Sequence, residues 1–494
     1  MIFRSLFLFE VVRLLRGPVP WGAAVLCLAL RLVATWEWLP DMSVDPASTS
    51  GAMLLPAAAM MLAANLATSR DTRGGMPETL GALPGRAAER TGAATLAAVT
   101  AGAGIALPVM TGYLLVRWGM GPVAGVFDPY EALGGVLAVP FAAALGAMLA
   151  RWAPWLVAVP VAAFLIGAFT WLNGNQSGYG GWFLPVVLFH GPDWPQRPSA
   201  LHAVYLLAAV ALLAALTLLR HGVRPARLVA ALAAAAVAVP AGAAANAAAP
   251  GEEMNQRFEA MRKDPEALPH HMDARVRERY FGRDARRCEK HGAVTYCALR
   301  DYAAWIPAWV AAVDPVARAL PPAERDRLPV VRQLADTWWY AQHEERSVDT
   351  FMVWGRAGAE HTHRAMLASD VIRSVMGWRP PAGTEGCDAR GQSRVVVALW
   401  LLGQAVPPAP PEEREIQIGS SLFMRVQSPL GPIRYGAADL GYARRLLAAP
   451  DARQRIWRHW DTLLKPGTTV GQALPLLGLR SEFADEPVRG RPCS

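Results

Sequence analysis

The chain has 494 residues with a formal net charge of +8, and 53% of its residues are hydrophobic. Its length favours more than one domain. No basic tail or basic block occurs, so the positive charge does not indicate a nucleic-acid-binding protein.

The two halves of the chain differ in composition. Residues 1–249 contain 14 Arg, no Lys and only 10 Asp or Glu, whereas residues 250–494 contain 34 Lys or Arg and 30 Asp or Glu. The first half therefore has the charge-poor composition of a membrane domain, and the second half has that of a soluble domain.

Residues 1–17 precede the first long apolar run. Phe3, Phe7, Val11 and Leu14 recur at helical spacing, with arginines between them. This pattern predicts an interfacial amphipathic helix on the cytoplasmic face, with a frayed terminus as the alternative. No small-residue cleavage site follows, so we expect the first span to be a retained anchor.

Seven apolar stretches are long enough, or nearly so, to cross a bilayer. They cover residues 19–39, 52–68, 92–117, 132–150, 154–172, 201–219 and 228–248 of the membrane domain at 18–249. If loops alternate between the two sides, 11 arginines fall on one side and only Arg197 on the other. Loop arginines are retained in the cytoplasm, so the N-terminus is expected inside and residues 250–494 outside.

The fold class expected is an all-α polytopic membrane bundle of about seven transmembrane helices. A mainly α soluble C-terminal domain with a few short strands is expected to follow it. The chain is then a multi-pass protein of the cell membrane, in contact with membrane lipid.

Two polar residues interrupt the spans. Arg31 lies past the middle of the first span, where a charge costs about 2.5–3.5 kcal/mol on insertion scales. Such a charge marks a pathway or a partner, or else it snorkels or forms a structural pair, and Glu37 is placed for only a loose pairing. Asn65, near the end of the second span, is predicted to form an interhelical hydrogen bond.

Residues 69–91, SRDTRGGMPETLGALPGRAAERT, form the longest charged interruption of the first half. The lipid core offers no partners for these polar groups, and the arginines favour the cytoplasmic side. We call this segment the arginine-rich connection. A short helix is expected over 77–83, with Leu80 and Leu83 on one face.

Another loop, 173–200, contains the apolar run 182–189, which is too short to span. It is predicted to re-enter the outer leaflet or to cap the bundle, and an ordinary packed loop is the alternative.

In the soluble half, helical spacing predicts helices over 323–345, 358–378, 437–449 and 452–464, and alternation predicts a strand within 415–426. Residues 407–413 read as a linker. An extracytoplasmic location permits disulfides, and the even cysteine count there favours two bridges. Cys288 and Cys297 flank a predicted hairpin, which leaves Cys387 and Cys493 as the second pair.

No motif for chemistry stands out. The chain has no P-loop and no HExxH, so we predict no catalytic residue, no metal, no cofactor and no nucleotide hydrolysis on this chain. His270, His271 and the run 360–363 are the clustered ligand types, and solvated surface histidines are the favoured interpretation.

The arginine-rich connection resembles the first cytoplasmic loop of ABC-2 type permeases, especially actinobacterial ones. The matching residues are Arg70, Asp71, Gly75, Glu78, Leu80, Leu83, Pro84 and Arg86. The resemblance covers roughly residues 1–220 and includes an interfacial helix before the first span and short embedded helices between spans five and six. The family usually has one span fewer and no such C-terminal domain, although the tail looks like those of other actinobacterial permeases.

The resemblance implies a permease subunit of an ABC-type exporter, energised by a separate ATPase subunit that docks on the arginine-rich connection. It also implies a homo- or heterodimer of permeases. The alternative is a membrane-anchored extracytoplasmic binding or sensor module, and an external hydrolase is a third interpretation.

Overall fold

The computed structural model of the chain describes residues 2–73, 86–155, 157–174, 181–188, 197–248, 274–334, 347–350, 354–355, 363–378, 386–406, 416–417, 425–426, 429–483, 488 and 491–493. The chain divides into two compact units. The first comprises Met1–Trp36 and Pro40–Val276, and the second comprises Glu37–Leu39 and Arg277–Ser494.

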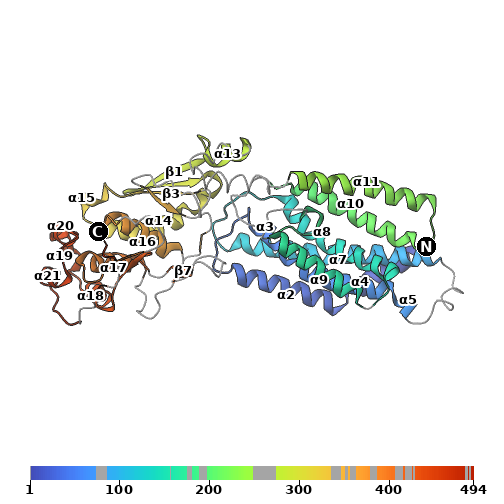
Figure 1. Cartoon of the computed structure of the whole chain (residues 1–494), viewed down its shortest axis with the longest axis horizontal. Helices are drawn as coiled ribbons and strands as arrows, with labels where there is room; N and C mark the ends of the chain where they lie inside the picture. The colour runs from blue at the N-terminus through green and yellow to red at the C-terminus, as the bar shows by residue number, and fades with distance from the viewer. Residues whose placement is uncertain are drawn as a thin grey trace. The chain divides into compact units, whose positions relative to one another are not determined.

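The first unit is a bundle of helices that run side by side (Figure 1). Its elements are α1 (Ile2–Leu15), α2 (Pro18–Thr35), α3 (Asp45–Ala52), α4 (Leu54–Thr68), α5 (Arg70–Arg73), α7 (Ala87–Gly119), α8 (Pro129–Trp152), α9 (Ala158–Gly174), the 3₁₀ turn η1 (Gly181–Phe183), α10 (Ser199–Leu219) and α11 (Pro225–Ala247).

Among the described residues, six helices are long and apolar enough to cross a membrane. They are α2, α7, α8, α10, α11 and the segment Asp45–Thr68, which joins α3 to α4. The predicted span at 154–172 forms α9, which has only 17 residues. Large apolar side chains such as Val33 and Phe164 are 76% and 72% exposed. These apolar surfaces fit contact with lipid and would be a liability in water.

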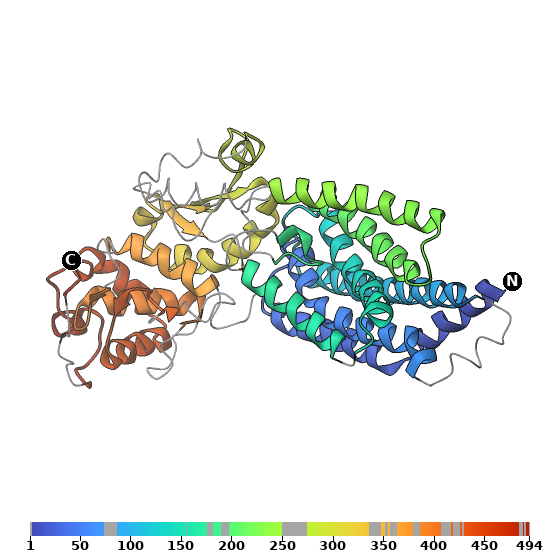
Figure 2. The ribbon, with the colours of Figure 1, turned by 45° about the vertical axis from the view of Figure 1, so that its right-hand side comes forward.

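Helix α8 lies at the centre of the bundle and packs against α4, α7 and α10 (Figure 2). In the most apolar 18-residue stretch of α8, 72% of the residues are buried, compared with 22% in that of α2. Small residues permit this packing: a side-chain carbon at Gly146 would collide with the backbone of Met61. Close backbone approach increases the van der Waals contact between helices, which contributes to their association in lipid. Asn65 adds an interhelical hydrogen bond, from Nδ2 to the Gly146 carbonyl at 3.1 Å.

The segment 40–51, which separates the first two predicted spans and was therefore expected to be a loop, contains most of the helix α3. This polar helix can be buried because its hydroxyl groups donate hydrogen bonds to carbonyls of α3 itself and of α8. Thr49 donates to the Asp45 carbonyl at 2.7 Å, and Ser50 donates to the Pro46 carbonyl at 3.0 Å and to the Glu131 carbonyl at 3.1 Å. The connection between the first two spans is therefore shorter than predicted.

Helix α1 packs against α7 but is less clearly amphipathic than the sequence pattern predicts. Phe9, Leu8 and Val12 are about half-exposed, whereas Glu10 is buried. The outward side of α1 thus carries both apolar side chains and the arginines Arg4 and Arg13, and its single acidic residue points into the protein.

The second unit contains a four-stranded sheet in the order β1-β2-β3-β4. Strands β1 (Arg286–His291) and β2 (Val294–Leu299) pair antiparallel, and β3 (Val330–Gln333) and β4 (Ser347–Thr350) continue the sheet in parallel. The other elements are α13 (Ala274–Phe281), η3 (Arg300–Trp305), α14 (Ile306–Ala319), α15 (Pro322–Arg325), α16 (His363–Val375), β5 (Cys387–Asp388), α17 (Ser393–Ala405), β6 (Ile416–Gln417), β7 (Arg425–Val426), β8 (Ile433–Arg434), α18 (Ala437–Ala448), α19 (Ala452–Arg458), α20 (Trp460–Leu463) and α21 (Val470–Leu476).

The helix predicted over 323–345 is right only at its start, where α15 lies, and wrong at Val330–Gln333, which is the strand β3. Pairing with β2 and β4 on both sides overrides the helical spacing of the apolar residues. The segment 415–426 contains two short strands, β6 and β7, in place of one. The predicted linker at 407–413 lies outside the described residues.

Both predicted disulfides are present, Cys288–Cys297 and Cys387–Cys493. The first joins residues directly opposite each other in the β1–β2 hairpin, whose turn contains Gly292 at φ +59°. That left-handed conformation favours glycine.

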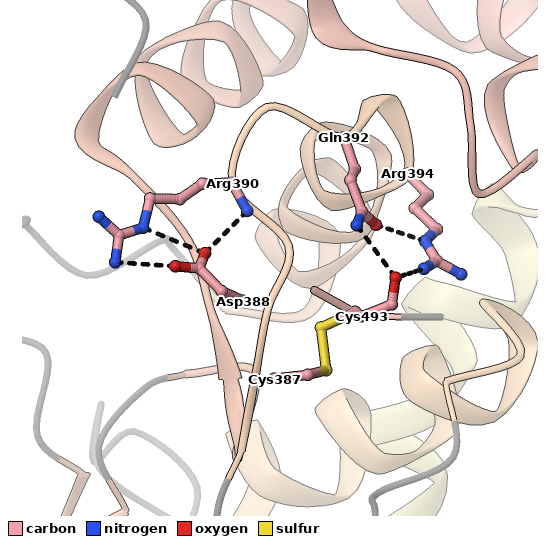
Figure 3. Close-up of a disulfide and its surroundings, with 6 residues drawn as sticks. All are labelled: Cys387, Asp388, Arg390, Gln392, Arg394 and Cys493. Carbon is pink, nitrogen blue, oxygen red and sulfur yellow. Dashed lines mark hydrogen bonds and ion pairs between the residues drawn. A yellow bond between two sulfur atoms is a disulfide. The ribbon is translucent and has the colours of Figure 1, made fainter. Parts of the chain in front are cut away.

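The second disulfide fixes the C-terminal segment beside β5 (Figure 3). Gln392 Nε2 and Arg394 Nη2 donate to the Cys493 carbonyl at 3.1 and 2.7 Å, and the Cys493 amide donates to the Asp388 carbonyl at 3.0 Å. Arg394 is 2% exposed. The end of the chain is therefore an integral part of the core around α17.

Candidate functional site

The arginine-rich connection leaves α4 through the short helix α5. Arg70, Asp71 and Arg86 are described, whereas Gly75, Glu78, Leu80, Leu83, Pro84 and the helix expected over 77–83 lie outside the described residues. Ser69 marks the exit from α4, where its buried hydroxyl donates to the Asn65 carbonyl at 2.7 Å. The first residues of the connection therefore continue directly from the second span.

Arg70 joins α5 to α1. Its Nη2 lies 3.1 Å from each carboxylate oxygen of Glu10, which is buried on α1. Burial raises the pKa of Glu10, and the nearby Arg13 guanidinium opposes this rise. The positive charges beside Glu10 thus offset part of the cost of burying its carboxylate.

Asp71 joins α5 to α8. Its Oδ2 lies 3.2 Å from Nη2 of Arg151, which is in the last turn of α8 and has a side chain only 9% exposed. Because α8 is the central helix of the bundle, this pair connects the arginine-rich connection to the most buried part of the first unit. We call Arg70–Glu10 and Asp71–Arg151 the α5 ion pairs.

His221 extends this network to the connection between α10 and α11. Its Nε2 lies 2.9 Å from the hydroxyl of Thr91, near the start of α7. Burial lowers the pKa of His221, and the positive charges of Arg151 and Arg227 lower it further. The neutral imidazole is favoured, which avoids adding a further cation next to Arg151.

At the opposite end of the bundle, Arg31 contacts α7. Its Nη2 donates to the Tyr113 hydroxyl at 3.2 Å, and its guanidinium carbon lies 5.3 Å from the centre of that ring. The Tyr113 hydroxyl donates in turn to Asp45 Oδ1 at 2.8 Å. The described partner of Arg31 is therefore a tyrosine on another span.

Arg117 completes this cluster. Its Nε lies 2.9 Å from Asp45 Oδ2, and the two side chains are 1% and 4% exposed. Its Nη1 also donates to the Thr35 carbonyl at the end of α2, at 2.9 Å. We call Arg31, Asp45, Tyr113 and Arg117 the buried charge cluster, which ties α2, α3 and α7 together.

Sequence reasoning flagged Arg31 but missed the other three members. A signal was available, because Asp45 and Arg117 carry opposite charges at the ends of two consecutive spans. Because residues 40–51 were expected to be a loop, Asp45 was not placed at the end of a span, and its pairing with Arg117 was not predicted.

The apolar run that begins at Trp182 is packed into the bundle as far as it is described. Trp182 is 1% exposed and lies under the guanidinium of Arg197, 5.1 Å from the ring centre. Arg197 also pairs with Glu131 at 2.6 Å and donates to the carbonyls of Val187 and Leu188. Residues 181–188 therefore cover this end of α8, α10 and α11.

One of the clustered histidines departs from the prediction of a solvated surface residue. His363 is 5% exposed, and its ring lies 5.5 Å from that of Trp38 and 5.6 Å from that of Trp354. These residues belong to the second unit, in which the Leu39 amide donates to the Trp354 carbonyl. His270 and His271 lie outside the described residues.

No family model, curated protein or solved structure matches the chain.

Proposed function

We propose that this chain is the transmembrane permease subunit of an ABC-type exporter of the ABC-2 type, energised by a separate ATPase subunit. The α5 ion pairs carry this proposal. If the connection only joined two spans, α5 would not need ion pairs with α1 and α8. A connection that transmits movement to the bundle does need such contacts. The resemblance of residues 69–91 to a coupling loop supports the same conclusion.

The mechanism is differential docking. An ATPase can drive a membrane conformation only if its contacts favour one arrangement of the helices over another. Closure of the ATPase would displace the arginine-rich connection, and the α5 ion pairs would pass that displacement to α1 and α8. Because α8 packs against α4, α7 and α10, its movement would rearrange most of the bundle.

We further propose that α9 is a seventh crossing. Ser199, at the start of α10, donates to Asp128 at the start of α8, and Trp152, at the end of α8, donates to the Leu216 carbonyl near the end of α10. Helices α8 and α10 are therefore parallel, and the chain between them must return along the bundle. The 17 residues of α9 are at the lower limit of roughly 17–25 residues for a span.

An odd number of crossings puts the C-terminus on the side opposite the arginine-rich connection. With that connection in the cytoplasm, the second unit is extracytoplasmic, and its two disulfides fit an oxidising compartment. We propose that two such permeases, identical or different, assemble with the ATPase in the lipid bilayer.

The second candidate function is a membrane-anchored extracytoplasmic binding or sensor module. The second unit favours it, because it has a core of its own centred on α17 and two disulfides. The bundle would then be only an anchor, and the α5 ion pairs would have no role. An ATPase gene beside this one favours the permease, and a gene that stands alone favours the module.

The Asp71→Arg variant tests the role of the α5 ion pairs. We expect it to reduce ATP hydrolysis by the assembled complex about tenfold, within the usual range of coupling between two sites. The swap Asp71→Arg with Arg151→Asp restores the opposite charges and should recover most of the activity. The measurement is the hydrolysis rate of complexes purified with equal ATPase content.

Glu37→Arg is the matched control, since it makes the same charge change at an exposed position outside the arginine-rich connection. It should leave hydrolysis near the wild-type rate. Equal loss in the single variant and in the swap would refute the coupling role of the pair.

A further inference from the structure

A groove of about 240 Å³ lies between the connection from α1 to α2 and one face of α4. One wall is formed by residues 13, 14 and 17–20. The other wall is a single helical stripe of α4, made of Ala59, Leu62, Ala63, Leu66 and Ala67.

The sequence explains the hollow. The stripe repeats every three or four residues, so its members share one face of the helix. Its three alanines leave space between the two leucines, and the chain turns away at Gly17 before α2 begins at Pro18. Leu62 and Leu66 are 41% and 47% exposed, so the groove opens to the lipid-facing surface.

Arg13 is the charged residue of the lining, and its side chain is 47% exposed. The nearest described acid is Glu10, whose carboxylate lies 3.6 Å from Arg13 and 3.1 Å from Arg70. Two guanidinium groups thus share one carboxylate, which leaves an excess positive charge. Glu10 is also the only acidic residue in residues 1–36.

We propose that this groove binds an anionic phospholipid, with an acyl chain along the α4 stripe and the headgroup phosphate at Arg13. The groove is smaller than the roughly 300–1,000 Å³ of pockets for drug-sized ligands, which favours a stretch of chain over a compact molecule. Basic pockets between membrane helices on the cytoplasmic side recognise anionic headgroups. The lipid would hold α1 and the start of α2 against α4, whether or not the protein transports a substrate.

The experiment is native mass spectrometry of the full-length protein in detergent, titrated with phosphatidylglycerol or phosphatidylcholine. The wild type should retain phosphatidylglycerol in preference to phosphatidylcholine. Arg13→Gln should weaken phosphatidylglycerol binding about fivefold, as expected for one lost basic side chain at a membrane surface. Ala63→Phe fills the groove and should abolish that binding.

Two matched controls accompany these variants. Arg4→Gln removes an exposed arginine of α1 outside the groove, and Ala236→Phe adds the same bulk on an exposed face of α11. Both should bind phosphatidylglycerol as the wild type does. Equal binding of the two lipids, or an equal loss in Arg4→Gln and Arg13→Gln, would overturn the proposal. The proposal would also be overturned if Ala63→Phe disrupted a dimer but left phosphatidylglycerol binding unchanged. That result would show that a second copy of the chain covers the groove.

Discussion

Replacing Asp45 by Asn is expected to destabilise the bundle by about 3–5 kcal/mol, the usual cost of removing one partner of a buried ion pair. Asp45 lies 2.9 Å from Arg117 and accepts a hydrogen bond from Tyr113. The variant keeps the shape of the side chain but leaves the buried Arg117 charge uncompensated by Asp45. The measurement is the free energy of unfolding of the detergent-purified protein.

Glu37→Gln is the control, since it removes an exposed carboxylate only eight positions away in the sequence. It should change stability by no more than about 0.5 kcal/mol, as is usual for surface substitutions. The double variant Asp45→Asn with Arg117→Met should be less destabilised than the sum of the two single variants, because the two residues interact directly. Additive losses would contradict the assignment of Asp45 and Arg117 as a pair.

Removal of the second disulfide, by Cys387→Ser with Cys493→Ser, is expected to have the largest effect on the second unit. The two cysteines are 106 residues apart in the sequence. Chain entropy predicts a stabilisation of about 4.7 kcal/mol for a closed loop of roughly 100 residues. Loss of the bridge should also release the hydrogen bonds that Gln392 and Arg394 donate to the Cys493 carbonyl (Figure 3). Thermal unfolding and hydrogen exchange of the α17 amides measure the loss.

Cys288→Ser with Cys297→Ser provides the comparison, because it opens a bridge between residues only nine positions apart. Its expected cost is below about 3 kcal/mol, the value for a loop of roughly 15 residues. It should also leave the exchange of α17 unchanged. A larger loss from the hairpin bridge than from Cys387–Cys493 would contradict this ranking.

Apolar run length predicted most of the long helices of the bundle, because bilayer thickness sets the length of a spanning helix. It did not predict α3. Its Thr49 and Ser50 read as loop residues, and only their hydrogen bonds within the helix and to α8 permit burial. Strand β3 was missed for a related reason: its conformation is decided by two neighbouring strands that are distant in sequence.

The sequence indicated several residues of the candidate site, but it did not indicate the contacts between them. Arg31 was recognised by the cost of a charge in lipid, but its contact with Tyr113 joins positions 82 residues apart. Arg70 and Asp71 were recognised by resemblance, and their partners Glu10 and Arg151 come from helices 60 and 80 residues away. Pairings of this kind depend on how the helices pack, so no local sequence pattern predicts them.

The most direct test of the proposed function is purification of the native complex from membranes, followed by mass spectrometry of its subunits. Our proposal predicts an ABC ATPase in the wild-type complex. It also predicts loss of that ATPase from the variant Glu78→Lys with Leu80→Asp, which alters the arginine-rich connection. A purified complex without a nucleotide-hydrolysing subunit, or one that retains the ATPase in this variant, would contradict the proposal.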